Sequence, residues 1–112
     1  MNTLKNTVHL IGRLGRDPEV RTLDGGRKVA RLSLATGETY ALKDGNRRST
    51  TQWHNLVVWG NLAGVCEKYL TKDREIAIAG KLTYRKWEDS QGLKHTNTEI
   101  LVDELLLVGN SK

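Results

Sequence analysis

The chain has 112 residues, which suffice for one modest hydrophobic core and are too few for two domains. A composition of 38% hydrophobic and 28% charged residues with a single proline is typical of a globular domain and excludes a disordered or fibrous chain. Eighteen Lys and Arg against 13 Asp and Glu give a formal charge of +5, which favours a polyanionic partner, above all nucleic acid.

Membrane and covalent anchors are not expected. No apolar run approaches the roughly 18 residues that span a bilayer, and the N-terminal sequence lacks the pattern of a signal peptide. We therefore expect a cytoplasmic protein with no membrane partner. Cys66 is the single cysteine and has no CxxC neighbour, so neither an internal disulfide nor a structural zinc site is predicted.

The N-terminal residues predict a long, curved first strand. Apolar residues alternate with polar ones at Val8, Leu10 and Leu14. Gly12 suits a bend in this strand, and Gly15-Arg16-Asp17-Pro18 predicts a turn at its end.

A second strand follows a predicted hairpin turn at Asp24-Gly25-Gly26. Its inward residues are Ala30, Leu32 and Leu34, which alternate with Arg31, Ser33 and Ala35. The polar tract at 41–49 contains Asp44-Gly45 and is predicted to form a flexible basic loop.

The segment TQWHNLVVWG, at 51–60, predicts a third strand with two different faces. Because side chains alternate along a strand, Trp53, Asn55, Val57 and Trp59 share one face, and Leu56 and Val58 lie on the other. The face with Leu56 and Val58 suits a core. Both indole rings therefore lie on the face that is less suited to burial.

The second half of the chain predicts one helix and two further strands. Asn61 is predicted to cap the helix, whose apolar residues at helical spacing are Leu62, Val65, Cys66, Tyr69 and Leu70. A fourth strand is expected from about Glu75 to Trp87, and a turn at 89–92 leads to the last strand, at about 96–108. The apolar part of the last strand suggests burial on both faces.

Five strands with one short helix between the third and the fourth are the order of the OB-fold, an all-β Greek-key barrel. Glycines at 12, 37, 60 and 80 suit the sharp bends of such a barrel. The pattern leaves open a different small all-β barrel or a sandwich.

The aromatic residues divide into two groups. Tyr69 and Tyr84 are expected in the core, whereas Trp53, Trp59 and Trp87 have polar or basic strand neighbours and are expected outside it. Exposed rings of this kind can stack nucleobases, at ~1–3 kcal/mol per base and without sequence preference. The alternative is that the tryptophans cover apolar surface or form a subunit interface.

Basic residues accompany the aromatic ones. Lys81, Arg85 and Lys86 flank Trp87 in the fourth strand, and further cations are Arg13, Arg31, Lys43, Arg47 and Arg48. Each of them singly could be an ordinary solvated charge. Together they favour contacts to the phosphates of a nucleic acid.

No residue pattern predicts catalysis. His9, His54 and His95 have no carboxylate or cysteine at ligand spacing and are expected to be structural, so no metal and no cofactor is predicted. The glycine pairs match neither a dinucleotide-binding motif nor a P-loop. An OB-fold nuclease would need clustered carboxylates, and Asp103 and Glu104 lie on alternating faces.

Four segments together resemble the bacterial single-stranded DNA-binding protein family: VHLIGRLGRDPEVR, VARLSLATGETY, TQWHNLVVWGNLAGVCEKYL and GKLTYRKWEDSQG. The resemblance runs from Asn6 to about Val108. It implies an OB-fold domain over 1–108 that assembles as a homotetramer and protects single-stranded DNA in replication, recombination and repair, at the nucleoid. It implies no enzymatic activity.

The resemblance also assigns roles to residues. Trp53, Trp59 and Trp87 match base-stacking positions, and Tyr40 matches a fourth one, where relatives often carry tryptophan. Phosphate contacts are implied for Lys43, Lys72, Arg85 and Lys86, and a subunit contact for His54. Asn55 and Asn61 stand where relatives often carry a basic residue, a loss that Arg13 and Arg31 could offset.

The C-terminal end departs from the family pattern. Relatives continue into a linker with an acidic tip that recruits replication and repair proteins, whereas 109–112 is a short end without an acidic tail. Recruitment through such a tail is therefore not expected. The competing hypothesis of another class is an OB-fold subunit of a replication or primosome complex, with its aromatic residues at a protein interface.

Overall fold

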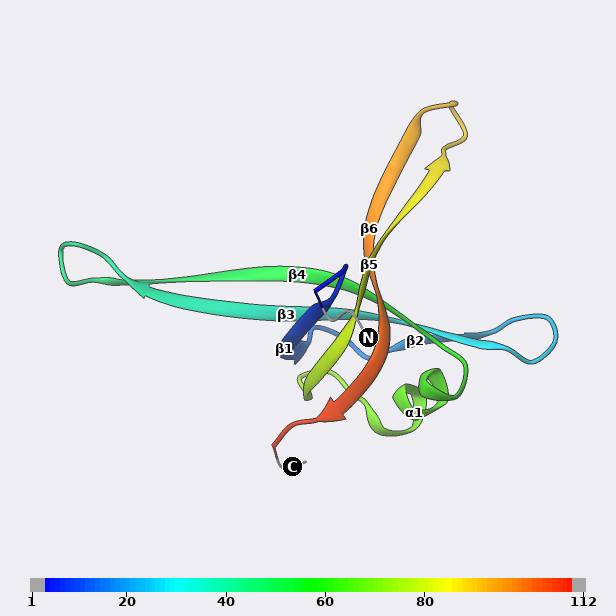
Figure 1. Cartoon of the computed structure of the whole chain (residues 1–112), viewed down its shortest axis with the longest axis horizontal. Helices are drawn as coiled ribbons and strands as arrows, with labels where there is room; N and C mark the ends of the chain where they lie inside the picture. Colours follow the sequence, from blue (N-terminus) through cyan, green and yellow to red (C-terminus); the bar gives the residue numbers. More distant parts are fainter. Residues whose placement is uncertain (1–3, 110–112) are drawn as a thin grey trace.

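The computed structural model describes residues 4–109 and consists of strands and one short helix (Figure 1). In chain order, the elements are β1 (Val8–Leu14), β2 (Glu19–Thr22), β3 (Lys28–Ala41), β4 (Arg47–Trp59), α1 (Asn61–Tyr69), β5 (Glu75–Glu88) and β6 (Lys94–Leu107). The predicted helix between the Trp53 strand and the next one is confirmed.

The strands close into a five-membered barrel. The sheet order is β1-β5-β6-β4-β3-β2, and an additional pairing of β1 with β3 closes the ring. Only the β4–β6 contact in this ring is parallel, with Leu56 opposite Ile100; the other pairs are antiparallel. The chain therefore has the predicted OB-fold.

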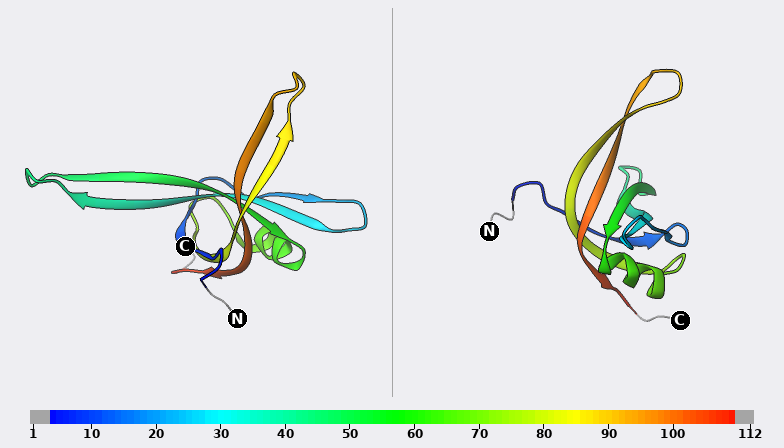
Figure 2. Two further views of the ribbon diagram at one scale, coloured as in Figure 1. Left: turned by 45° about the horizontal axis from the view of Figure 1, so that its top comes forward. Right: turned by 90° about the vertical axis from the view of Figure 1, so that its right-hand side faces the viewer.

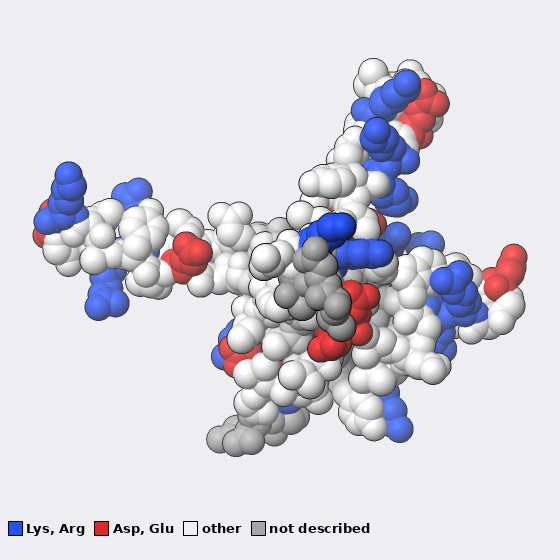
Figure 3. All heavy atoms as spheres, in the orientation of Figure 1, with Lys and Arg blue, Asp and Glu red and all other residues white. Residues whose placement is uncertain are grey.

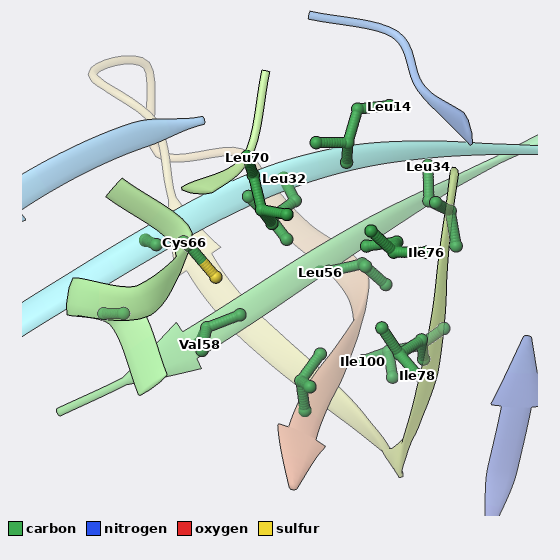
Figure 4. Packing of buried hydrophobic residues seen from close by; sticks show 13 residues of the cluster. Leu14, Leu32, Leu34, Leu56, Val58, Cys66, Leu70, Ile76, Ile78 and Ile100 are labelled. Atoms are coloured by element: carbon green, nitrogen blue, oxygen red, sulfur yellow. The ribbon is translucent and has the colours of Figure 1, made fainter. Parts of the chain in front are cut away.

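Aliphatic side chains fill the barrel (Figure 4). The alternation of each strand supplies them, and the buried members on the strands are Leu14, Ala30, Leu32, Leu34, Leu56, Val58, Ile76, Ile78, Ile100 and Val102. Helix α1 adds Ala63 and Cys66 at one end of the barrel, and Leu70 follows it. Two crossings are so close that a Cβ at Gly12 or Gly80 would overlap the backbone of Ala35 or Leu101, respectively.

Two long hairpins project from the barrel and diverge from each other (Figures 1 and 2). We call them the β3–β4 arm, at 37–51, and the β5–β6 arm, at 81–98. The radius of gyration is 16.4 Å, against about 13 Å for a compact chain of this length, and the principal extents are 56 × 41 × 33 Å. The arms give the molecule this extended shape.

The predicted boundaries need three corrections. The turn at 15–18 ends the first strand as predicted, but the sequence pattern did not predict the short strand β2 that follows it and pairs with β3. The expected loop at 41–49 is shorter: β3 and β4 stay paired up to Ala41 and Arg47, so the loop covers only 42–46, where Asp44 Oδ1 accepts the Asn46 N–H in a tight turn. Gly60 rather than Asn61 is the N-cap of α1, at φ 70°, which glycine adopts readily.

The expected burial of several apolar residues is wrong. Tyr69 is 55% exposed and Tyr84 65%, because the Tyr69 ring lies on the outside of α1 and Tyr84 lies in the β5–β6 arm, which has no core beneath it. The last strand is not buried on both faces: Leu106 is 68% exposed and Leu107 45%. At these two residues β6 pairs with β5 alone, because its pairing with β4 is limited to Ile100 and Leu101.

Some expectations involve residues outside the described range. The domain bounds 1–108 and the short end at 109–112 include residues 1–3 and 110–112, so those bounds stay a prediction. Among residues 4–109, no helix is long and apolar enough to cross a membrane.

Candidate nucleic-acid interface

One row of residues runs across four strands on the outside of the barrel. The strand register pairs Arg31 of β3 with Val57 of β4, Val57 with Leu101 of β6, and Leu101 with Lys81 of β5. Strand alternation extends this row along each strand to the residues that we call the aromatic face: Arg31, Trp53, Asn55, Trp59, Lys81, Arg85 and Trp87. The face is continuous from the Trp53 strand to the β5–β6 arm.

Trp53 is the most exposed tryptophan, at 61%, and lies at the base of the β3–β4 arm. A Cβ at Gly15 would overlap its indole ring, so the ring lies directly against this glycine. In the same turn, Asp17 Oδ1 accepts the backbone N–H of Lys72 at 2.8 Å, and the Arg13 guanidinium, on β1, donates to the Asp73 carbonyl at 3.2 Å. In the strand register, Arg13 lies opposite Ala35 and Ala35 opposite Trp53, so Arg13 belongs to the same row as Trp53.

Trp59 ends β4 and is 36% exposed. The Arg27 guanidinium carbon lies 4.6 Å from the ring centroid, a cation–π contact. A base could stack on the indole face that Arg27 leaves open, and the guanidinium places a positive charge beside it.

The two remaining predicted stacking residues lie on the arms. Trp87 is 41% exposed and lies opposite His95 of β6, with which it stacks. Tyr40 is 45% exposed and pairs with Arg48 in the β3–β4 arm. Alternation places Tyr40 on the opposite side of that arm from Trp53, so the structure does not bring it onto the aromatic face.

A buried carboxylate lies in the middle of the aromatic face. Glu99 is 8% exposed, and its Oε2 lies 3.0 Å from Nη1 of Arg31 and 3.6 Å from Nε of Arg85. Both arginine side chains are about half exposed, at 44% and 52%. Because a guanidinium has five N–H donors, each arginine keeps donors for a phosphate while Glu99 fixes its position.

The other predicted cations are exposed lysines at scattered places. Lys81 and Lys86 lie along the β5–β6 arm, Lys43 in the turn of the β3–β4 arm, and Lys72 in the turn after α1. Basic side chains gather along the β5–β6 arm and at the tip of the β3–β4 arm (Figure 3). Positive charge therefore lies along the β5–β6 arm and at the tip of the β3–β4 arm.

His54, the predicted subunit contact, is partly buried on β4. Its Nε2 lies 2.9 Å from the Thr36 hydroxyl on β3. The imidazole is thus fixed on the side of β4 opposite Trp53 and Asn55.

No group of three or more His, Cys, Asp or Glu side chains within residues 4–109 is placed to hold a metal ion. Cys66 is buried against the core, and burial raises the pKa of its thiol to about 11. Such a thiol stays protonated and is a poor nucleophile.

Sequence reasoning missed three residues of this surface. Glu99 was not considered, Arg27 was not linked to Trp59, and His95 was expected to be merely structural. The sequence contained one usable signal, for the contact between Trp87 and His95, because a tight turn at 89–92 places these two residues opposite each other. The contacts of Glu99 and Arg27 join segments far apart in the chain and need the barrel closure to be known.

Comparison with known proteins gives consistent matches. The model of the "Single-strand binding protein family" matches residues 5–108. Similar curated proteins are single-stranded DNA-binding protein 1 of Chlorobaculum tepidum, 42% identical over 105 residues, and the single-stranded DNA-binding protein of Neisseria meningitidis, 38% identical over 104 residues. Each match covers 93% of this chain, which spans 65% and 60% of these relatives' lengths, respectively.

Solved structures give the same result. A Plasmodium falciparum SSB in complex with ssDNA matches 97% of this chain and all of its own, with a TM-score of 0.84 and 36% identity. A deletion mutant of the Thermus aquaticus single-stranded DNA binding protein matches 93% of this chain and 50% of its own, with a TM-score of 0.80 and 27% identity.

Proposed function

The chain belongs to the single-strand binding protein family, and from that premise we propose that it binds single-stranded DNA without sequence preference. Bases stack on Trp53, Trp59 and Trp87 of the aromatic face, and on Tyr40 as a separate position on the other side of the β3–β4 arm. Phosphates are bound by the basic residues around them, which are Arg13, Arg31, Lys43, Lys72, Lys81, Arg85 and Lys86. The structure of a relative with ssDNA supports this function, and the family does not favour a protein-interaction subunit as the alternative.

The observation that carries the proposal is the aromatic face. It presents three indole rings, each partly exposed, on a surface that also displays the half-exposed guanidiniums of Arg31 and Arg85. Trp53 and Trp59 are six residues apart on one strand, about 20 Å at ~3.3 Å per residue. That spacing suits successive bases of an extended strand, and stacking accepts any base.

The chain also has a surface suited to a second copy of itself. Within residues 4–109, the edge of β1 that faces away from β5 has no strand partner from Val8 to Gly12. Beside this edge, a mainly apolar hollow is lined by Ile11, Ala77, Ala79 and Leu106, with His9 and Glu104 as its polar residues, and Ile11 is 61% exposed. An open edge beside exposed apolar residues supports assembly, here as a homotetramer in which His54 contacts another subunit.

The cellular role follows from this binding. A coat of this protein on unpaired DNA protects it during replication, recombination and repair, at the nucleoid in the cytoplasm. The chain acts by binding and not by catalysis, in keeping with a family of DNA-binding proteins.

A fluorescence titration tests the function. Oligo(dT) of increasing length should quench the tryptophan emission of the protein, and the affinity should fall with salt at about 0.7 per phosphate neutralised. Duplex DNA of the same length is the control and should quench far less, because its bases are already stacked. Absence of quenching by oligo(dT) at low salt contradicts the proposal.

Sedimentation tests the assembly separately. The Ile11→Glu variant should sediment as a smaller species than the unchanged chain, because a charge in the apolar hollow opposes its burial. A Gln91→Ala variant, changed at an exposed turn, should keep the native assembly. An unchanged chain that sediments as a monomer contradicts the homotetramer.

A further inference from the structure

The β5–β6 arm carries a ring stack that the proposed function does not require. Trp87 of β5 and His95 of β6 lie directly opposite each other in the antiparallel register. Their ring centroids are 4.4 Å apart, and the ring planes differ by 20°. One face of the Trp87 indole is therefore covered by the imidazole, which leaves the other face for a base.

Asp89 holds the imidazole in this orientation. Its Oδ2 lies 2.8 Å from His95 Nε2, and its Oδ1 accepts the backbone N–H groups of Gln91 and Leu93 at 2.9 and 3.0 Å. The same carboxylate thus fixes both the turn of the arm and the histidine ring. The hydrogen bond from His95, followed by that from Leu93, lowers the pKa of Asp89, so this carboxylate stays ionised near neutral pH.

We propose that His95, clamped by Asp89, is a positioning residue for Trp87 in DNA binding; this inference rests on the proposed function. An exposed tryptophan on an arm without a core can adopt several rotamers, and a base that stacks on it must immobilise it. His95 fixes the indole before the base arrives. The cost of ordering one such side chain corresponds to about a two- to tenfold loss of affinity when the stack is removed.

The test uses the full chain and fluorescein-labelled oligo(dT), with binding followed by anisotropy. His95→Ala should bind two- to tenfold more weakly than the unchanged chain. His95→Phe keeps a flat ring that can stack on Trp87, so it should restore the affinity. Gln91→Ala, in the same turn, is the control and should match the unchanged chain.

A second readout does not depend on DNA. In a variant that keeps only Trp87, made by Trp53→Phe and Trp59→Phe, the stacked ring should limit the motion of the indole. Adding His95→Ala should therefore lower the anisotropy of the tryptophan emission, and adding His95→Phe instead should not. Equal anisotropy with and without His95→Ala contradicts the stack.

The failures of the two proposals are distinguishable. An unchanged chain that does not bind oligo(dT) contradicts the proposed function. An unchanged chain that binds, together with His95→Ala of equal affinity, contradicts the positioning role alone.

Discussion

The barrel and its two arms are built from the same kind of paired strands, but the barrel buries its apolar side chains, whereas the arms expose theirs to solvent. In the barrel, inward residues such as Leu34 and Val58 are fully buried. In the β5–β6 arm, both sides of the hairpin are exposed, and large rings such as Tyr84 and Trp87 face solvent. Aliphatic packing therefore supplies stability in the barrel, while the arms offer aromatic and basic groups to a ligand.

This difference explains where the aromatic residues are. The chain has no phenylalanine, and all six of its Trp and Tyr side chains are at least 36% exposed. A core without any aromatic ring is unusual, because such rings bury the most apolar area. Aromatic rings kept out of the core are available for stacking.

The largest expected effect is a loss of stability when the core of the barrel is disturbed. Leu56→Ala removes a side chain that is 1% exposed at the centre of the core, and the free energy of unfolding should fall by ~2–5 kcal/mol. Urea denaturation measures it. Leu93→Ala, at a leucine that is 58% exposed in the turn of the β5–β6 arm, is the matched control and should change stability by less than about 0.5 kcal/mol. Equal losses in the two variants would remove the distinction between barrel and arms.

The next largest effect is a loss of DNA affinity when a ring at the base of the β3–β4 arm is removed. Trp53→Ala should weaken oligo(dT) binding by ~1–3 kcal/mol, the contribution of one stacked base. Titration with a labelled oligonucleotide measures it. Tyr69→Ala changes a ring of similar exposure on α1, away from the aromatic face, and should bind like the unchanged chain. A larger loss of affinity for Tyr69→Ala than for Trp53→Ala would show that DNA binds at α1 and not on the aromatic face.

A smaller effect separates phosphate contacts from stacking. Arg31→Ala should make the slope of log affinity against log salt shallower by about 0.7, since one phosphate contact is lost. The slope is obtained from titrations at several salt concentrations. Lys68→Ala, which removes a cation from α1, should leave the slope unchanged. An unchanged slope for Arg31→Ala would mean that Glu99 neutralises this arginine also in the complex.

The smallest effect concerns the buried thiol. Because burial raises the pKa of Cys66 from 9.0 to about 11, native protein at pH 8 should react very slowly with iodoacetamide, and denatured protein should react readily. The raised pKa also means that the unfolded thiol ionises first. Stability from this group is therefore complete below pH 9 and declines as the pH rises towards 11. Rapid alkylation of the native chain would show that the thiol is accessible.

The sequence predicted the barrel better than the arms. Alternating apolar residues such as Leu32, Leu34 and Leu56 predict one buried face on each strand, and a closed barrel buries these faces. In the arms nothing is buried, so alternation says little: the polar composition of 41–49 predicts a loop over the whole tract, although Ala41 and residues 47–49 pair as strands. The expected burial of Tyr84 is wrong for the same reason. A ring in a strand is usually buried where a core lies beneath the strand, and the β5–β6 arm has no core beneath it.

The candidate site was predicted in part. The exposed face of Trp53 and Trp59 follows from strand alternation, and the family resemblance supplied residues in turns, such as Lys43 and Lys72. The contacts that fix the rings join distant segments: Gly15 with Trp53, and Arg27 with Trp59. Local patterns carry no information on such contacts, since they depend on how the strands close.

The most direct test of the central claim is photochemical cross-linking of the full chain to oligo(dT) that contains bromodeoxyuridine, with the linked peptides identified by mass spectrometry. Cross-links are expected in the peptides that carry Trp53, Trp59 and Trp87, on β4 and the β5–β6 arm. Cross-links confined to α1 and the peptide of Tyr69 would contradict it.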